Sequence, residues 1–290
     1  MLNFVCGVID CPDLPMNVSR EMLQQSSILR VLRNQLKKQA VNMLMDLQND
    51  EVKYNTFYEY FHKNLKLGLH EGDEKLLTFL RFNLYGDESK KWSLDKYISD
   101  KLQEGQKKIY YICNNETPLL YAYHNRGFSV IHFKDSIDEF MMQRIYKYKD
   151  YEFINIGKEH ELPWENDNLE EEEDFSNFLL KKLDSENVEK IKMTNIFLEN
   201  DIGCITTSKF GMTGNMENLM KSQPLGGGNP GIKGQQRLEL NFNHPIIQKL
   251  RDYYNNDKEN NNVYKLIDTV YQCCLLNSGF QIEKPNDFSK

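Results

Sequence analysis

The sequence predicts a mixed α/β fold divided into two domains. A chain of 290 residues with 40% hydrophobic residues can bury a large core, and its length fits two domains of about 100–200 residues each. Apolar residues recur at helical spacing early in the chain, and short apolar runs then alternate with helical segments. We therefore expect a first domain over residues 1–157, an acidic linker over 158–174 and a smaller α/β domain over 175–290.

The first domain is expected to open with a layer of helices. A short apolar strand over residues 4–10 leads through a proline-containing loop into a long amphipathic helix from Ser19 to Leu47. Further helices are expected at Tyr54–Leu65, Glu74–Phe82 and Leu94–Leu102, where apolar side chains recur every three or four residues.

Strands and helices alternate in the rest of the first domain. Apolar runs at Lys108–Cys113, Ser129–Phe133 and Phe153–Ile156 predict strands, and Leu119–Arg126 and Ile137–Tyr148 predict helices between them. This alternation is typical of a small parallel sheet with crossover helices.

The composition changes at the predicted linker. Pro163 and the acidic run over 170–174 indicate a solvated connector or the start of a helix. The elements expected beyond it are a helix at Phe175–Leu183, strands at Val188–Phe197 and Gly203–Ser208, a short helix at Asn215–Gln223, a strand around Leu238–Leu240, and helices at Pro245–Tyr254 and Tyr264–Asn277. They would form the smaller mixed domain.

Charge and composition argue against several classes of function. A net charge of -7 disfavours a nucleic-acid partner. No apolar run reaches the length of a membrane span, so we expect a soluble protein without a membrane partner, in a reducing compartment. The six cysteines and six histidines show no metal-ligand spacing, so no metal site is expected. The glycine-rich loop over 226–231 lacks the ending of a P-loop, because Lys233 is followed by Gly234.

Arg20 and Gln24 are candidate catalytic residues. Arg20 lies in the first turn of a predicted helix, where the helix dipole disfavours a cation, and its planar guanidinium suits a phosphate. Gln24 lies one turn later on the same face, so both side chains could converge on an anion. On the pattern alone, an exposed arginine beside Glu21 explains the position better.

The second candidate is the short helix that carries several methionines. Methionine is flexible and polarizable, which suits a surface that accepts many partners. A core face at helical spacing is the alternative explanation. The side chains concerned are Met212, Met216, Leu219 and Met220.

Six blocks of this sequence together form a recognisable pattern. The first is FVCGVIDCPDLPMNVSREMLQQ, from Phe4 to Gln25. The others follow it along nearly the whole chain: KNLKLGLHE, GQKKIYYI, IDEFMM, NMENLMKSQ and LLNSGF. In their residues and in their order these blocks closely resemble the heat shock protein 90 family, and six ordered blocks are far more specific than a single motif.

The resemblance implies part of an ATP-dependent molecular chaperone. Residues 1–157 would be the end of the family's middle domain, and 175–290 most of its C-terminal dimerisation domain, without the last helix. In the family, the arginine of the SREMLQQ loop reaches the γ-phosphate of ATP and the following glutamine supports it, roles that fall on Arg20 and Gln24. ATP and Mg would be bound by an amino-terminal domain outside this chain, so the chain itself is expected to bind no cofactor and to hydrolyse no ATP alone.

The resemblance also implies partners. The short helix would contact unfolded or partly folded clients, although Met212 stands where the family commonly has tryptophan. Co-chaperones and a homodimer are expected of the full-length protein. The alternative is a protein-binding scaffold module that contributes nothing to ATP turnover. The cytoplasm and an organelle such as the mitochondrion both remain open as locations.

Overall fold

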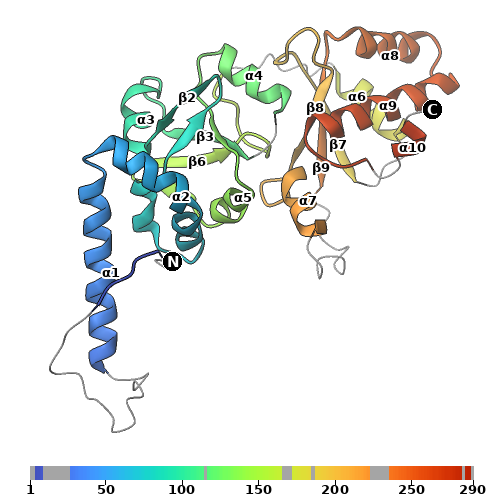
Figure 1. Ribbon diagram of the computed structural model, residues 1–290. Helices are drawn as coiled ribbons and strands as arrows, with labels where there is room; N and C mark the ends of the chain where they lie inside the picture. The colour runs from blue at the N-terminus through green and yellow to red at the C-terminus, as the bar shows by residue number, and fades with distance from the viewer. Residues whose placement is uncertain are drawn as a thin grey trace.

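The structure is a computed structural model that describes residues 4–8, 27–113, 116–164, 172–183, 187–222, 235–282 and 285–288. Two α/β lobes lie side by side, with the short helix α7 (Gly214–Ser222) beside their junction (Figure 1). The predicted mixed α/β fold is confirmed. Within these ranges, no helix is both long and apolar enough to cross a bilayer.

The first lobe contains a six-stranded mixed sheet of order β2-β1-β4-β3-β6-β5. Its central strand β3 pairs in parallel with β4 and β6, whereas β1, β2 and β5 pair antiparallel with their neighbours. The strands are β1 (Phe82–Leu84), β2 (Asp87–Trp92), β3 (Lys108–Cys113), β4 (Ile131–Phe133), β5 (Lys147–Tyr148) and β6 (Tyr151–Asn155). The helices of this lobe are α1 (Ser27–Leu47), α2 (Glu51–His70), the 3-10 helix η1 (Glu74–Phe79), α3 (Leu94–Asp100), α4 (Pro118–Asn125) and α5 (Ser136–Met142).

Helix α2 buries one face and carries a lysine within it. Lys66 is only 5% exposed, and its Nζ lies 2.5 Å from Asp135 Oδ2 and 2.7 Å from Asp138 Oδ1 at the start of α5. Burial raises the pKa of Asp138, and the charge of Lys66 opposes that rise. Because a buried charge is costly without a partner, this cluster fixes α5 against α2.

Several sequence predictions for the first lobe need correction. Residues 4–8 are not in a strand, because Phe4 packs on the rings of Phe57 and Phe61 instead of pairing with the sheet. The predicted helix Ile137–Tyr148 is wrong at its end: α5 stops at Met142, and β5 follows. The segment predicted as a helix at Glu74–Phe82 is η1 and then the start of β1.

The predicted parallel sheet is confirmed only at its centre. The antiparallel hairpin of β1 and β2 was not predicted, because the sequence DESKKW of β2 is almost wholly polar. Its burial pattern is that of a solvated edge strand, which leaves no apolar alternation to detect.

The second lobe contains a three-stranded sheet of order β7-β9-β8. β7 and β9 are parallel, and β8 is antiparallel to β9. The remaining elements are α6 (Glu173–Lys182), β7 (Val188–Thr194), β8 (Gly203–Thr207), β9 (Gln236–Asn241), α8 (Pro245–Asn256), α9 (Asn261–Asn277) and α10 (Pro285–Phe288). The order of strands and helices predicted from Phe175 to Asn277 is confirmed.

Hydrophobic side chains cluster within each lobe and also across the junction. The cluster at the junction joins Tyr110, Tyr123 and Phe128 of the first lobe to Phe197 and Cys204 of the second. The two lobes therefore share buried apolar surface.

The described part of the predicted linker packs against both lobes. Lys158 forms a bridge with Thr207 of β8, and the N–H of Glu159 donates to the Thr207 carbonyl at 2.8 Å. Trp164 packs on Tyr123, with ring centroids 4.8 Å apart. Residues 158–164 are thus packed and do not form a solvated connector. The acidic run was predicted to be either a connector or the start of a helix, and helix α6 does begin within it, at Glu173. The division into domains at this segment stays a prediction.

Candidate functional site

The carboxyl ends of β3 and β6 meet the second lobe at the junction. In open α/β sheets, ligands bind at the carboxyl ends of parallel strands, where the chain crosses from one side of a strand to the other. The chain does so here, because β4 lies on one side of β3 and β6 on the other. Cys113 ends β3, and Asn155 ends β6.

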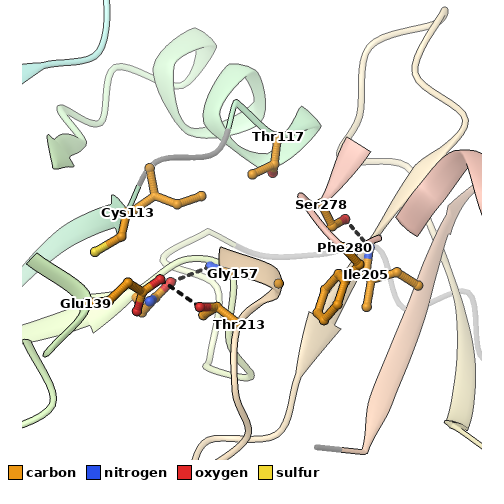
Figure 2. Close-up of a pocket in the computed structure, with 11 residues that line it drawn as sticks. Cys113, Thr117, Glu139, Gly157, Ile205, Thr213, Ser278 and Phe280 are labelled. Carbon is orange, nitrogen blue, oxygen red and sulfur yellow. Dashed lines mark hydrogen bonds between the residues drawn. The ribbon is translucent and has the colours of Figure 1, made fainter. Parts of the chain in front are cut away.

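The second lobe fills this position. Figure 2 shows Thr213, Ser278 and Phe280 facing Cys113 and Glu139 across the junction. The cavity that remains has a volume of about 20 Å³. A single water needs roughly 10–15 Å³, so this cavity has room for a water but not for a substrate.

Glu139 of α5 joins the two lobes. Its side chain is only 7% exposed, and its Oε1 accepts hydrogen bonds from Thr213 Oγ1 at 2.7 Å and from Asn215 Nδ2 at 3.2 Å. A buried carboxylate must be satisfied by donors, and here both come from the start of α7. Glu139 therefore sets the position of α7 on the first lobe.

The start of α7 is also held by contacts with the second lobe. Thr213 accepts the N–H of Met216 at 3.2 Å, which satisfies one of the free donors at the helix start. Asn218 Nδ2 donates to the carbonyl of Gly279 at 2.9 Å. A Cβ on Gly214 would lie 2.7 Å from the main chain of Gly279 and Phe280, so glycine is required for this close approach.

A groove of about 920 Å³ lies beside α7, between the two lobes. Its apolar side chains come from β3, α5, the segment before β5, β6, the loop before α7, and α7 itself. Phe210 is 91% exposed and Tyr146 is 69% exposed on this groove. The other apolar lining residues are Tyr111, Met142, Ile145, Phe153, Ile154, Met212 and Met216. Exposed aromatic side chains around a large groove are typical of a protein-interaction surface.

The predicted contact residues of the short helix divide into two groups. Met212 and Met216 line the groove, but Met216 is largely buried and lies near Gln143 of α5. Leu219 and Met220 are half-buried and lie outside the groove lining. The structure therefore brings Met212 to the groove surface and uses Met216 in its wall.

The predicted catalytic residues lie outside the described residues. Arg20 and Gln24 precede α1, whose described part begins at Ser27. The glycine-rich loop over 226–231 also lies outside them.

Two groove residues were missed by sequence reasoning. Phe210 follows Lys209 in a loop, where no periodic pattern marks it. Lys158 lines the groove half-buried, and no salt bridge to it is found among the described residues. Burial lowers the pKa of Lys158, and the charge of Glu139 partly opposes this effect. That Lys158 and Phe210 line one groove could only be recognised once both were placed in space.

The cysteines of the described ranges include three that are buried. Cys113, Cys204 and Cys274 are buried, and burial raises the pKa of each thiol. Across the described ranges, no group of three or more His, Cys, Asp or Glu side chains is arranged to hold a metal ion.

Comparison with known proteins gives one consistent family. A family model described as Hsp90 protein matches residues 1–290. The endoplasmin homolog of Arabidopsis thaliana is 34% identical, over 99% of this chain and 39% of its own length. Heat shock protein 83 of Leishmania donovani is 34% identical, over 100% of this chain and 68% of its own length. The chloroplastic heat shock protein 90-5 of Arabidopsis thaliana is 34% identical, over 98% of this chain and 38% of its own length. The chain thus spans about two fifths of the length of these plant relatives.

Proposed function

Because the chain belongs to the heat shock protein 90 family, we propose that it is part of an ATP-dependent molecular chaperone and that the groove beside α7 contacts clients. The observation that supports this proposal is the groove itself. It is about 920 Å³ in volume, and Phe210, Tyr146 and Met212 present apolar surface on it. A client whose core is not yet formed exposes apolar side chains that such a surface can cover.

The packing at the junction also supports this proposal, because it fixes the width of the groove. One wall of the groove belongs to the first lobe and the other to the loop before α7. Because Glu139 holds the start of α7 on α5 and Gly214 packs α7 closely against residues 279–280 of the second lobe, the groove keeps its width. A movement between the lobes would change that width and with it the affinity for a client.

We propose in addition that Arg20 and Gln24 act on ATP held by another domain. The SREMLQQ block supports this role, since it is the stretch in which the family's phosphate-contacting arginine lies. The arginine would neutralise negative charge on the γ-phosphate, and Gln24 would support its side chain. ATP and Mg would be bound by that other domain. Co-chaperones and a second copy of the chain are the further partners that family membership suggests.

The groove is tested by replacing two of its apolar side chains, the exposed Phe210 and the half-buried Met212. Phe210→Asp combined with Met212→Asp should abolish most of the protein's ability to suppress light scattering by a thermally unfolding model protein, because charged groups resist desolvation by an apolar segment. Val52→Asp is the matched control, because Val52 is 77% exposed and lies on α2, away from the groove lining. Equal suppression by the double variant and the control would reject the groove as the client site.

The catalytic role is tested in the protein that carries its ATP-binding domain. Arg20→Ala should lower ATP turnover on the order of 100-fold while ATP still binds, because removing a preorganised charge donor acts on the transition state. Arg30→Ala is the control, since Arg30 is an exposed arginine on α1. Unchanged turnover in Arg20→Ala would instead favour a scaffold module that contributes nothing to hydrolysis.

A further inference from the structure

The outer edge of β6 faces the groove, and part of its main chain has no hydrogen-bond partner among the described residues. The N–H groups of Glu152 and Ile156 donate to the carbonyls of Lys107 and Tyr111 on the side of β3, each at 3.0 Å. Since main-chain groups alternate between the two edges of a strand, those of Phe153 and Asn155 point to the opposite edge.

β5 covers only the first half of that outer edge. Its register with β6 pairs Tyr148 with Tyr151 and Lys147 with Glu152, and the Phe153 N–H then donates to the Tyr146 carbonyl at 2.9 Å. Among the described residues, no hydrogen bond outside the sheet is found for the N–H of Asn155 or the carbonyl of Phe153. The edge therefore offers one donor and one acceptor at the spacing of a strand.

The Phe153 carbonyl and the Asn155 N–H belong to residues that line the groove. Phe153, Ile154 and Asn155 all line it, so the groove runs along the half of the β6 edge with which β5 does not pair, where Phe153 is 9% and Asn155 8% exposed. Phe210 and Met212 line the same groove from the second lobe. A peptide segment bound in the groove would form main-chain hydrogen bonds with β6 on one side and would contact the side chains of Phe210 and Met212 on the other.

The charges along the groove indicate what kind of segment fits. The groove lining carries both signs, because Glu139, Glu152, Glu159 and Glu161 line it as well as three lysines. Of these lysines, Lys158 and Lys209 have no salt bridge among the described residues, whereas Lys108 pairs with Glu161. An occupant with a carboxylate would give these lysines a partner.

We propose that the β6 edge takes an extended client segment as an added β-strand, with apolar side chains at alternate positions and an acidic residue near Lys158. This inference rests on the proposed function of the groove and names the conformation that the groove recognises. Main-chain pairing explains how one surface accepts clients of different sequence, because every polypeptide carries the same N–H and C=O groups.

The test uses a fluorescein-labelled octapeptide of alternating leucine and serine residues with an aspartate at its end. Two further versions carry N-methyl groups either on all leucines or on all serines. In an added strand only one of these sets of N–H groups faces β6. One methylated version should therefore bind about two- to tenfold more weakly than the parent, as expected for the loss of the one hydrogen bond to the Phe153 carbonyl, and the other should bind as the parent does.

Two further readouts use the unmodified chain. Hydrogen exchange of the Asn155 amide should slow when the parent peptide binds, because that N–H gains a carbonyl partner. Replacing the peptide's aspartate by lysine should weaken binding several-fold at low salt. Equal affinities for both methylated versions, or unchanged exchange at Asn155, would overturn the strand-addition proposal.

Failure of the proposed function would look different. If the parent peptide binds Phe210→Asp with Met212→Asp as tightly as the unsubstituted chain, the groove is not the peptide site at all. If the double variant loses the peptide but both methylated versions bind equally, the groove holds clients without adding a strand.

Discussion

At the scale of single residues, the junction depends on a glycine. Gly214 begins α7 against the main chain of Gly279 and Phe280, where a Cβ would lie 2.7 Å from both. In an isolated helix, alanine is preferred to glycine by about 0.5–1 kcal/mol. Glycine is therefore needed at position 214 for the close packing of α7 on the 279–280 main chain, although alanine would be the better helix former.

Gly214→Ala should lower the free energy of unfolding by about 1–3 kcal/mol, despite the better helix propensity of alanine, because α7 must move away from the 279–280 main chain. Urea denaturation measures this change. Gly7→Ala is the control, since nothing lies within 4 Å of a Cβ at Gly7. A Gly214→Ala protein as stable as the unsubstituted chain would show that α7 is not packed as described.

His160 makes the packed linker segment sensitive to pH. Its Nδ1 donates to the Lys158 carbonyl at 2.7 Å, and its Nε2 accepts a hydrogen bond from the hydroxyl of Tyr123. Burial lowers the pKa of His160, and its bond to the Lys158 carbonyl partly opposes this effect. The neutral ring is therefore the form that the fold stabilises.

The unfolded chain takes up a proton on His160 near its ordinary pKa of about 6.5, while the folded chain resists protonation to lower pH. The unfolded state binds more protons in that window, so this contribution to stability is complete above pH about 6.5 and falls as the pH drops. The Tm of the unsubstituted chain should accordingly fall relative to that of His160→Gln between pH 7.5 and 5.5. A constant difference between the two Tm values would contradict this.

At the scale of elements, the seven-residue helix α5 connects α2 to α7. A helix this short is not stable by itself, so its position comes from contacts at both sides. Lys66 of α2 pairs with Asp135 and Asp138 at its start, and Glu139 binds Thr213 one residue later. A shift of α2 would thus reach α7 through two adjacent residues of α5.

Glu139→Ala should lower the free energy of unfolding by about 1–3 kcal/mol, because Thr213 and Asn215 lose their buried acceptor. It should also weaken peptide binding in the groove, since α7 is no longer held at its place on α5. Glu104→Ala is the matched control: Glu104 is exposed and lies outside the groove lining. Urea denaturation and peptide fluorescence anisotropy measure the two effects, and equal behaviour of both variants would contradict the role of Glu139.

The elements that sequence reasoning predicts well are those whose pattern is local. The run KIYYIC predicts β3 with its observed bounds, because a strand buried on both faces is continuously apolar. The polar hairpin strand β2 gives no such signal. The groove could not be predicted either, since residues 139–161 and 209–216 form it together only after the two lobes pack. Arg20 and Gln24 follow from a family resemblance and stay predictions, because they lie outside the described residues.

At the scale of the whole molecule, the two lobes have separate cores and a shared one. One cluster lies in the first lobe around Leu65, Phe79 and Tyr97, and another in the second lobe around Leu238 and Ile267. The junction cluster adds apolar contacts between them, and Glu139 adds polar ones. Unfolding of one lobe should therefore expose buried surface of the other and lower its stability.

Phe197→Ala tests this coupling, because Phe197 belongs to the second lobe but is buried in the junction cluster. The cavity should cost about 3–5 kcal/mol. If the lobes are coupled, amide exchange should accelerate in β3 as well as in β9. Ile247→Ala, in the core of the second lobe alone, should accelerate exchange in β9 far more than in β3. Exchange in β3 that is unaffected by Phe197→Ala would mean that the lobes unfold independently, and α7 could then not transmit movement between them through the shared core.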